Sequence, residues 1–174
     1  MFAQNKYFYY QERAVSMKLY IKRDSSACNC VFVIYDELGK EKYTVFAEKS
    51  NLFYIKTNDN ICVAKIKRIS ISNLLAYNIN VGNKKIRLLV TASKGELSGI
   101  CYGNNWKICG IAAAKTFAIT DVDNSVIARQ SKVYLKHDAY ELEVFRESKE
   151  LLSLSAAVCI NMLNSVDNPI AQTV

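Results

Sequence analysis

Leu151-Leu-Ser-Leu-Ser-Ala-Ala-Val-Cys-Ile-Asn-Met-Leu163 is the stretch that decides the fold of this 174-residue chain. None of its residues is charged, and its polar members, Ser153, Ser155 and Asn161, do not gather on one side of a helical wheel. A helix that is apolar on every side must be enclosed by protein or lipid. The run is too short to span a bilayer, which takes about 20 apolar residues. The sequence therefore predicts that most of 151–163 is a helix buried inside the protein.

Almost everything before this helix has the pattern of short β-strands. From Tyr140 to Phe145, apolar side chains alternate with Glu141 and Glu143, which is the period of a half-buried strand. Gly82-Asn83 has the chemistry of a tight hairpin turn. Residues 93–103 are richer in Gly and Ser and are expected to form a loop around another short strand. The other predicted strands are 7–10, 19–21, 30–35, 43–46, 52–55, 61–66, 69–72, 76–81, 86–91, 106–110, 116–120 and 126–130.

A β-rich chain that ends in an all-apolar helix predicts a mainly β fold, a closed barrel with that helix as its core. We expect one domain over residues 1–174, with Ser148 as the helix N-cap and Glu150 in the first turn. An internal echo relates Asp59–Lys65 to Asp123–Arg129, 64 residues later, with Asp36–Lys42 as a looser third copy. The echo fits an up-and-down barrel or one assembled from similar halves, although Asp-Asn turns before strands are also common.

The net charge of +7 is concentrated in one segment. No acidic residue lies between Asp59 and Glu96, and the rest of the chain is balanced. A local basic field can recruit phosphates, anionic lipid or nucleic acid, whereas the alternative is a solvated sheet face whose lysines discourage edge pairing. Interleaved exposed aromatics, typical of nucleic-acid binding, are not evident in this segment. The candidate ligand-binding residues, expected on one surface, are Lys65, Lys67, Arg68, Lys84, Lys85 and Arg87.

No catalytic or metal-binding pattern stands out, so we predict no enzyme, no metal site and no cofactor. His137 is the only histidine, and a turn beside Asp138 explains it better than an acid/base pair. Cys28-Asn29-Cys30 lacks the spacing of zinc sites, and Asp121–Asn124 lacks the glycine and glutamate of a calcium loop, so a turn is expected there. Trp106 is expected in the core, and the alternative is that Trp106 and Tyr102 stack on a base or sugar of a ligand.

The six cysteines are expected to be reduced. Met1–Ser16 contains no uninterrupted apolar run of the kind found in secretory signals. A cytoplasmic location is therefore the default, with peripheral contact at a membrane left open.

Several segments carry a family likeness. The segments are Ile34–Gly39, Tyr54–Lys56, Val63–Ile66, Tyr77–Ile79, Trp106–Gly110, Phe117–Asp121, Val126–Ala128, Lys132, Tyr140–Val144 and the spaced apolar residues Leu151, Leu154, Ala157 and Ile160. Together these segments make the sequence resemble the LURP-one-related family of the tubby C-terminal-like superfamily over nearly the whole chain.

The resemblance implies a twelve-stranded, mostly antiparallel barrel around an apolar C-terminal helix. Relatives in the superfamily include tubby proteins, which bind phosphoinositides through basic side chains, and phospholipid scramblases. It thus implies a non-catalytic binding or tethering module, with an anionic phospholipid or phosphoinositide head group as the leading ligand. Three alternatives stay open: a protein-interaction scaffold with an incidental basic patch, nucleic-acid binding through the same patch, and an enzyme whose pocket the sequence hides.

Overall fold

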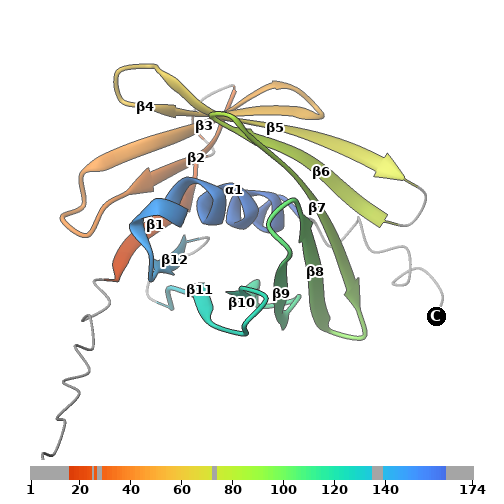
Figure 1. Ribbon diagram of the computed structural model, residues 1–174. Coiled ribbons are helices and arrows are strands. Elements are labelled where there is room, and N and C mark those ends of the chain that lie inside the picture. Colours follow the sequence, from red (N-terminus) through yellow and green to blue (C-terminus); the bar gives the residue numbers. More distant parts are fainter. Residues whose placement is uncertain (1–15, 25, 27–28, 72–73, 135–138, 164–174) are drawn as a thin grey trace, which may run out of the picture.

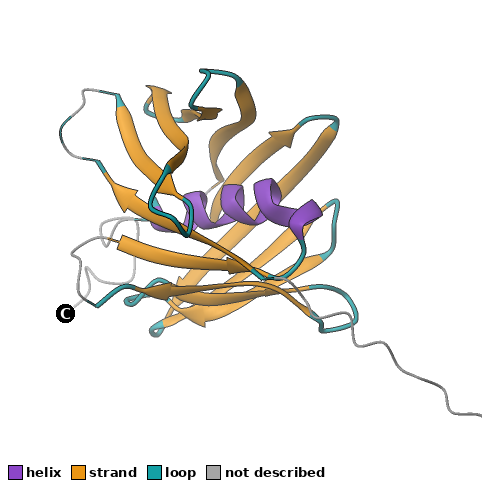
Figure 2. Cartoon of the chain, turned by 90° about the vertical axis from the view of Figure 1, so that its left-hand side faces the viewer, coloured by secondary structure: helices purple, strands orange, loops and turns teal. Residues whose placement is uncertain are grey.

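The computed structural model describes residues 16–24, 26, 29–71, 74–134 and 139–163. In these ranges twelve strands close into a barrel, and one α-helix runs through its interior (Figures 1 and 2). The elements are β1 (Met17–Arg23), β2 (Cys30–Tyr35), β3 (Glu41–Lys49), β4 (Leu52–Thr57), β5 (Cys62–Ile71), β6 (Leu74–Val81), β7 (Lys84–Ser93), β8 (Glu96–Tyr102), β9 (Trp106–Ile111), β10 (Thr116–Thr120), β11 (Val126–Lys132), β12 (Ala139–Val144), the 3₁₀ turn η1 (Glu147–Lys149) and α1 (Glu150–Asn161).

The barrel has a simple up-and-down topology. Each strand pairs antiparallel with its neighbours in sequence, and β1 closes the barrel on β12, with Met17 opposite Val144 and Ile21 opposite Tyr140. Because successive strand residues point to opposite faces, one set of side chains fills the interior and the other lies outside. The predicted mainly β barrel around a C-terminal helix is confirmed.

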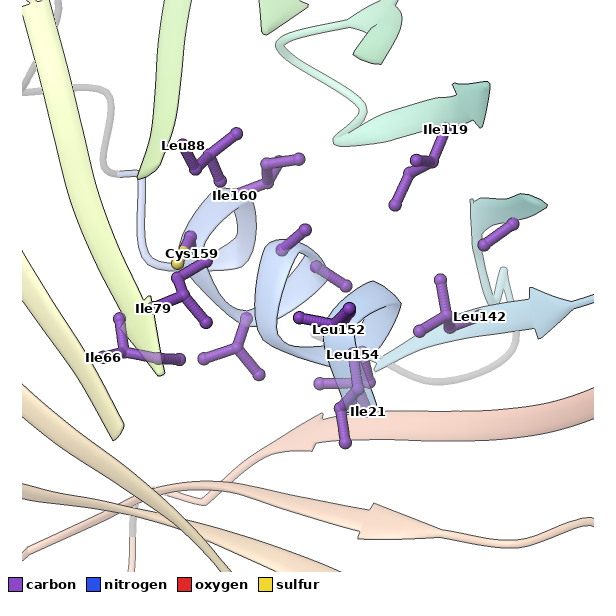
Figure 3. Close-up of a cluster of buried hydrophobic side chains, with 14 of the residues drawn as sticks. Ile21, Ile66, Ile79, Leu88, Ile119, Leu142, Leu152, Leu154, Cys159 and Ile160 are labelled. Atoms are coloured by element: carbon purple, nitrogen blue, oxygen red, sulfur yellow. The ribbon is translucent and has the colours of Figure 1, made fainter. Parts of the chain in front are cut away.

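The helix α1 is the centre of the hydrophobic core. Every residue from Leu152 to Met162 is buried, and Ala157, Val158 and Cys159 have no exposed surface. Strand side chains such as Ile66, Ile119 and Leu142 surround it on different sides (Figure 3). Its nearest strands are β5, β6, β11 and β12. The predicted burial of the apolar helix is confirmed.

The start of the helix differs from the prediction. Ser148 lies in η1, and no side chain caps either η1 or α1. The tight 3₁₀ turn leads the chain from β12 into the barrel, so the serine precedes the capping position. Glu150 takes over the anchoring: its Oε1 accepts a hydrogen bond from the Tyr43 hydroxyl at 3.1 Å and pairs with Lys42 Nζ at 2.7 Å. This buried carboxylate ties the helix start to β3.

The other end of the helix is held by a buried amide pair. Gln130 Nε2 donates to Asn161 Oδ1 at 2.7 Å, and Asn161 Nδ2 donates back to Gln130 Oε1 at 3.0 Å. Lys115 Nζ donates to the Asn161 carbonyl oxygen at 2.8 Å. Buried polar groups are costly unless bonded, so these contacts favour one depth for the helix in the barrel.

The predicted strands 61–66 and 69–72 coincide with the single strand β5, Cys62–Ile71, and residue 72 lies outside the described residues. The charged residues Lys67 and Arg68 interrupt the apolar pattern, which suggested a break. In the barrel Lys67 simply faces outward, and a strand with one solvated face accepts it without interruption. The predicted strand 7–10 lies outside the described residues.

The segment 93–103, predicted as a loop around a short strand, contains the strand β8, which is longer than predicted and is joined to β7 by a turn at Lys94-Gly95. Its inward positions, Leu97, Gly99 and Cys101, are all buried. A Cβ added at Gly99 would lie 3.3 Å from Ile108 Cβ, so this glycine serves close packing rather than a loop.

Three hairpin turns share one geometry. In each, the first residue donates its N–H to the fifth carbonyl, the fourth donates back to the first, and the fourth has a positive φ. Each turn is accompanied by a register shift in the adjoining strand pair. The turns are Asp36–Lys40, Thr57–Ile61 and Asp121–Ser125, with Gly39, Asn60 and Asn124 at the left-handed position. The last two join β4 to β5 and β10 to β11, so the echo seen in sequence recurs half a barrel apart.

Candidate functional site

Four of the six candidate cations line one open groove on the outer wall formed by β5–β8, with a volume of about 950 Å³. The strands β5 and β7 contribute the cations, β6 between them contributes two amides, and apolar or small residues form the rest of the lining. This basic groove is lined by Lys65, Lys67, Asn78, Asn80, Lys85, Ile86, Arg87, Leu89, Tyr102 and Gly103.

Strand register brings the cations together. Across β5, β6 and β7, one row contains Lys65, Asn80 and Lys85 at paired positions. The next row contains Lys67, Asn78 and Arg87. Neighbouring strands are about 4.8 Å apart, so the backbones of the two cations in a row are about 10 Å apart with an amide between them. The groove is therefore a two-by-two arrangement of cations around a neutral strand.

One of the amides positions the arginine. Arg87 Nε donates a hydrogen bond to Asn78 Oδ1 at 3.0 Å. This bond uses one of the five N–H donors of the guanidinium, and the planar group can present a pair of the others to a carboxylate or phosphate.

The groove contains no carboxylate among its lining residues. In the described part of the chain, none of its four cations forms an ion pair. At the margin of the groove, Lys65 Nζ lies 5.6 Å from the ring centre of Tyr54. Glu48, hydrogen-bonded to the Tyr54 hydroxyl, raises the pKa of that phenol, while Lys65 lowers it. The positive potential of the other three cations is thus open to an external anion.

The remaining two candidates lie elsewhere. Arg68 follows Lys67 on β5, so its side chain starts on the opposite face, where it is half-buried at a position paired with Tyr77. Lys84 is exposed at the first position of β7, one residue out of phase with the groove cations. The two-residue period of a strand separates both from the groove.

The candidate set does not include the other six residues of the groove lining, which are Asn78, Asn80, Ile86, Leu89, Tyr102 and Gly103. The asparagines could have been found, because the predicted turn at Gly82-Asn83 fixes their register against β7. The sequence suggests Tyr102 only as a stacking partner of Trp106, because Tyr102 lies outside the basic segment 59–96. It is 50% exposed, so an exposed aromatic side chain borders the cations of the groove.

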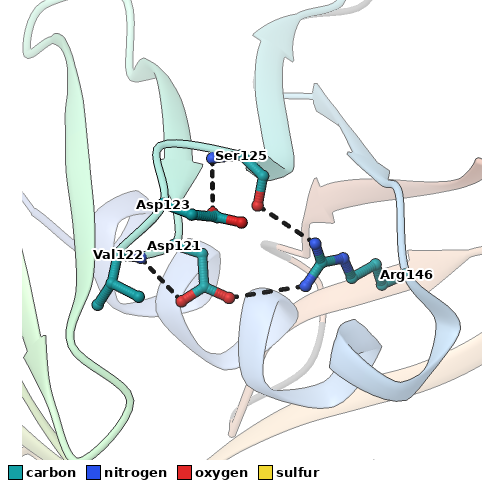
Figure 4. A network of polar contacts seen from close by, with 5 residues as sticks. All are labelled: Asp121, Val122, Asp123, Ser125 and Arg146. Atoms are coloured by element: carbon teal, nitrogen blue, oxygen red, sulfur yellow. Dashed lines mark hydrogen bonds and ion pairs between the residues drawn. The ribbon is translucent and has the colours of Figure 1, made fainter.

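The acidic cluster after β10 is a turn, as predicted (Figure 4). Asp121 Oδ1 accepts the Val122 N–H, and Asp123 Oδ1 accepts the Ser125 N–H, both at 2.9 Å. Hydrogen bonds from the Ser125 hydroxyl and N–H lower the pKa of the Asp123 carboxyl. Arg146 pairs with Asp121 at 3.6 Å and donates to Ser125 Oγ at 3.2 Å. The carboxylates serve the turn and the approach to the helix.

The other candidates for chemistry are structural or lie outside the described ranges. Trp106 is buried, as predicted, and Lys149 Nζ lies 5.7 Å from its ring centre. Burial raises the pKa of the Cys30 thiol to about 11. The cysteines within the described ranges are free thiols, whereas Cys28 and His137 lie outside those ranges. In the same ranges no group of three or more metal-ligating side chains occurs, and no helix is long and apolar enough to cross a membrane.

Comparison with known proteins identifies a structure with a similar fold and a matching family. Its fold is similar to the X-ray structure of a protein from Arabidopsis thaliana, with a TM-score of 0.55 and 11% identity over 83% of this chain and 89% of that one. At this identity the likeness shows the fold alone. No curated protein matches the chain. The sequence pattern of the LURP-one-related family matches residues 17–161, from the start of β1 to the end of α1. The chain belongs to the LURP-one-related family.

Proposed function

We propose that the protein is a non-catalytic binding or tethering module whose basic groove binds the anionic phosphate head groups of phospholipids at the cytoplasmic face of a membrane. One observation carries this function. Lys65, Lys67, Lys85 and Arg87 surround a single groove that has no carboxylate in its lining. Unneutralised cations held this close repel one another, and an external polyanion would relieve that repulsion.

The groove chemistry suits phosphate. Ammonium and guanidinium groups form charge-assisted hydrogen bonds to phosphate oxygens. Asn78 and Asn80 add amide donors between the two cationic strands without adding charge. Such binding is mainly electrostatic, so we expect it to weaken as salt rises.

A charge reversal inside the groove, compared with one just outside it, tests the proposal. We expect K85E/R87E to bind phosphatidylcholine vesicles containing phosphatidylserine at least about a hundredfold more weakly than the native chain, at a contribution of about 1 kcal/mol per cation near such a surface. K84E places the same charge change one residue away, outside the groove, and should lose only a small part of the affinity. Vesicle co-sedimentation at two salt concentrations measures both.

The outcomes separate the alternatives. Unchanged thermal midpoints for both variants would show that any lost binding is not lost folding. If the native chain ignores these vesicles at low salt, or if K84E loses as much affinity as K85E/R87E, the head-group function is wrong. If the native chain binds duplex DNA more tightly than vesicles at the same salt concentration, nucleic-acid binding becomes the better account of the basic groove.

A further inference from the structure

Two large apolar side chains stand exposed on β8 beside the basic groove. Ile100 is 45% and Tyr102 is 50% exposed, at consecutive outward positions of the strand. Tyr102 is paired with Arg87 of β7, and Ile100 is paired with Lys107 of β9, which is also exposed. This β8 ridge, Ile100 and Tyr102, therefore has a cation at a paired position on each side.

Single exposed apolar residues are common and need no explanation. The β8 ridge differs because it adjoins the groove and is flanked by cations on both neighbouring strands. Proteins that lie on a bilayer have this layout: basic side chains reach the head groups while aromatic and aliphatic side chains enter the boundary between head groups and acyl chains. Lys and Arg can reach phosphates while their stems stay on apolar surface.

Resting on the proposed function, we propose that the outer wall over β5–β9 is a bilayer-docking surface, in which the basic groove takes lipid head groups and the β8 ridge inserts into the membrane boundary. The occupant is an anionic bilayer rather than a free phosphate compound. Ile100 lies outside the groove lining, so an anion confined to the groove gains nothing from it. A lipid surface covers both at once.

Two probes separate the groove from the ridge. Inositol hexakisphosphate reports on the groove alone, and vesicles of phosphatidylcholine with phosphatidylserine report on groove and ridge together. We expect I100S to bind the vesicles about tenfold more weakly, since it removes a buried apolar side chain from the docked state, and to bind inositol hexakisphosphate as the native chain does. V122S is the matched control, because Val122 is 65% exposed on the turn after β10, and it should bind both probes normally.

A second measurement reads insertion directly. Trp106 is the only tryptophan and is buried, so a tryptophan introduced at an exposed position supplies a new signal that is quenched by lipid brominated along its acyl chains. We expect brominated phosphatidylcholine in the same vesicles to quench I100W and to leave V122W unchanged.

The failures of the two proposals are distinguishable. An unquenched I100W in a chain that still binds the vesicles, or an I100S variant with native vesicle affinity, overturns the docking surface and leaves the groove function standing. If I100S loses affinity for the vesicles and for inositol hexakisphosphate by the same factor, the docking surface is also wrong, because Ile100 would then act through the groove. If K85E/R87E keeps native affinity for inositol hexakisphosphate, the groove function itself fails and the inference falls with it.

Discussion

Two outer faces of the barrel occupy equivalent places, six strands apart, and carry opposite charge arrangements. On the first, over β5, β6 and β7, one row of paired positions reads Lys65, Asn80, Lys85. On the second, over β11, β12 and β1, the corresponding row reads Arg129, Glu143, Lys18. The flanking strands supply cations in both rows, whereas the middle strand supplies an amide in one and a carboxylate in the other.

The next row repeats the contrast. Asn78 lies between the cations of β5 and β7, whereas Glu141 lies between Ser131 and Tyr20. Glu141 forms a 3.0 Å ion pair with Lys18, and the smaller hollow on that side, about 430 Å³, contains two carboxylates in its lining. The cations of the second face are thus balanced by carboxylates on the same face, whereas those of the first face are open to an outside anion. The residues of the middle strand, β12 or β6, make this difference.

The largest expected effect comes from a substitution in the helix α1, which supports the strands of both faces. The strands β5, β6, β11 and β12 are those nearest α1, and Ala157 within it is fully buried. Ala157→Asp would bury a lone carboxylate and should destabilise the fold by about 3 kcal/mol or more. Chemical denaturation followed by circular dichroism measures the loss, with Ala157→Ser as a milder control. A cooperatively folded Asp variant of native stability would contradict the central position of the helix.

The next prediction converts the first face into the second. N78E/N80E copies the carboxylates of β12 onto β6 and should reduce binding to anionic vesicles about thirtyfold, since two new charges at about 1 kcal/mol each oppose the cations of the groove. N78Q/N80Q retains amides and should keep most of the affinity. Titration of both variants against phosphatidylserine-containing vesicles measures the difference. Equal affinities would mean that the middle strand does not decide the outcome.

Alkaline pH distinguishes the shared core from either surface. Burial raises the pKa of the Cys101 thiol from 9.0 to about 12, and that of Cys159 in the same direction. Above pH 9 the unfolded chain releases these protons while the folded chain keeps them. The contribution of the two thiols to the free energy of unfolding is therefore fully present below pH 9 and is lost as pH rises above it. For Cys101 the free energy of unfolding should fall by roughly 1 kcal/mol per pH unit, and Cys159 should add to the fall in the same direction. Urea unfolding at pH 8 and pH 10 measures this fall, and a native-sized fall in Cys101→Val would contradict the role of Cys101.

The smallest expected effect is the reverse conversion. E141N/E143N gives the second face the amide pattern of the first and should create weak, salt-sensitive anion binding there. In the two rows that hold Glu141 and Glu143, the paired positions on the flanking strands carry two cations, Arg129 and Lys18, where the basic groove has four. The gained affinity should therefore stay well below that of the basic groove. Measuring it in a K85E/R87E background removes the signal of the first face. The thermal midpoint should hardly move, because exposed ion pairs contribute little to stability.

The fold could be predicted from sequence because its signals are local. The apolar run 151–163, the alternation around Leu142 and the Asp-Asn turns each reflect one element and its burial. The sequence could show that the groove would be built from this basic segment, but it could not show which of the cations line it. Arg68 and Lys84 are each one residue away from a groove cation on the same strand, so their side chains start on the opposite face. Nothing in the sequence links Tyr102 to the basic groove, because the extent of the strand that contains it could not be predicted: a glycine that serves close packing, such as Gly99, cannot be distinguished from a flexible one in a single sequence.

The position of the core helix after all twelve strands sets the order in which the protein can be made. During synthesis β1 emerges first, yet its partner β12 and the helix that fills the interior emerge last. Until then the inward-facing side chains have nothing to pack against, and the pairing that closes the ring spans almost the whole described chain. Folding that depends on such distant contacts is slow and exposes apolar surface meanwhile. A newly made chain should therefore depend on molecular chaperones until α1 has left the ribosome.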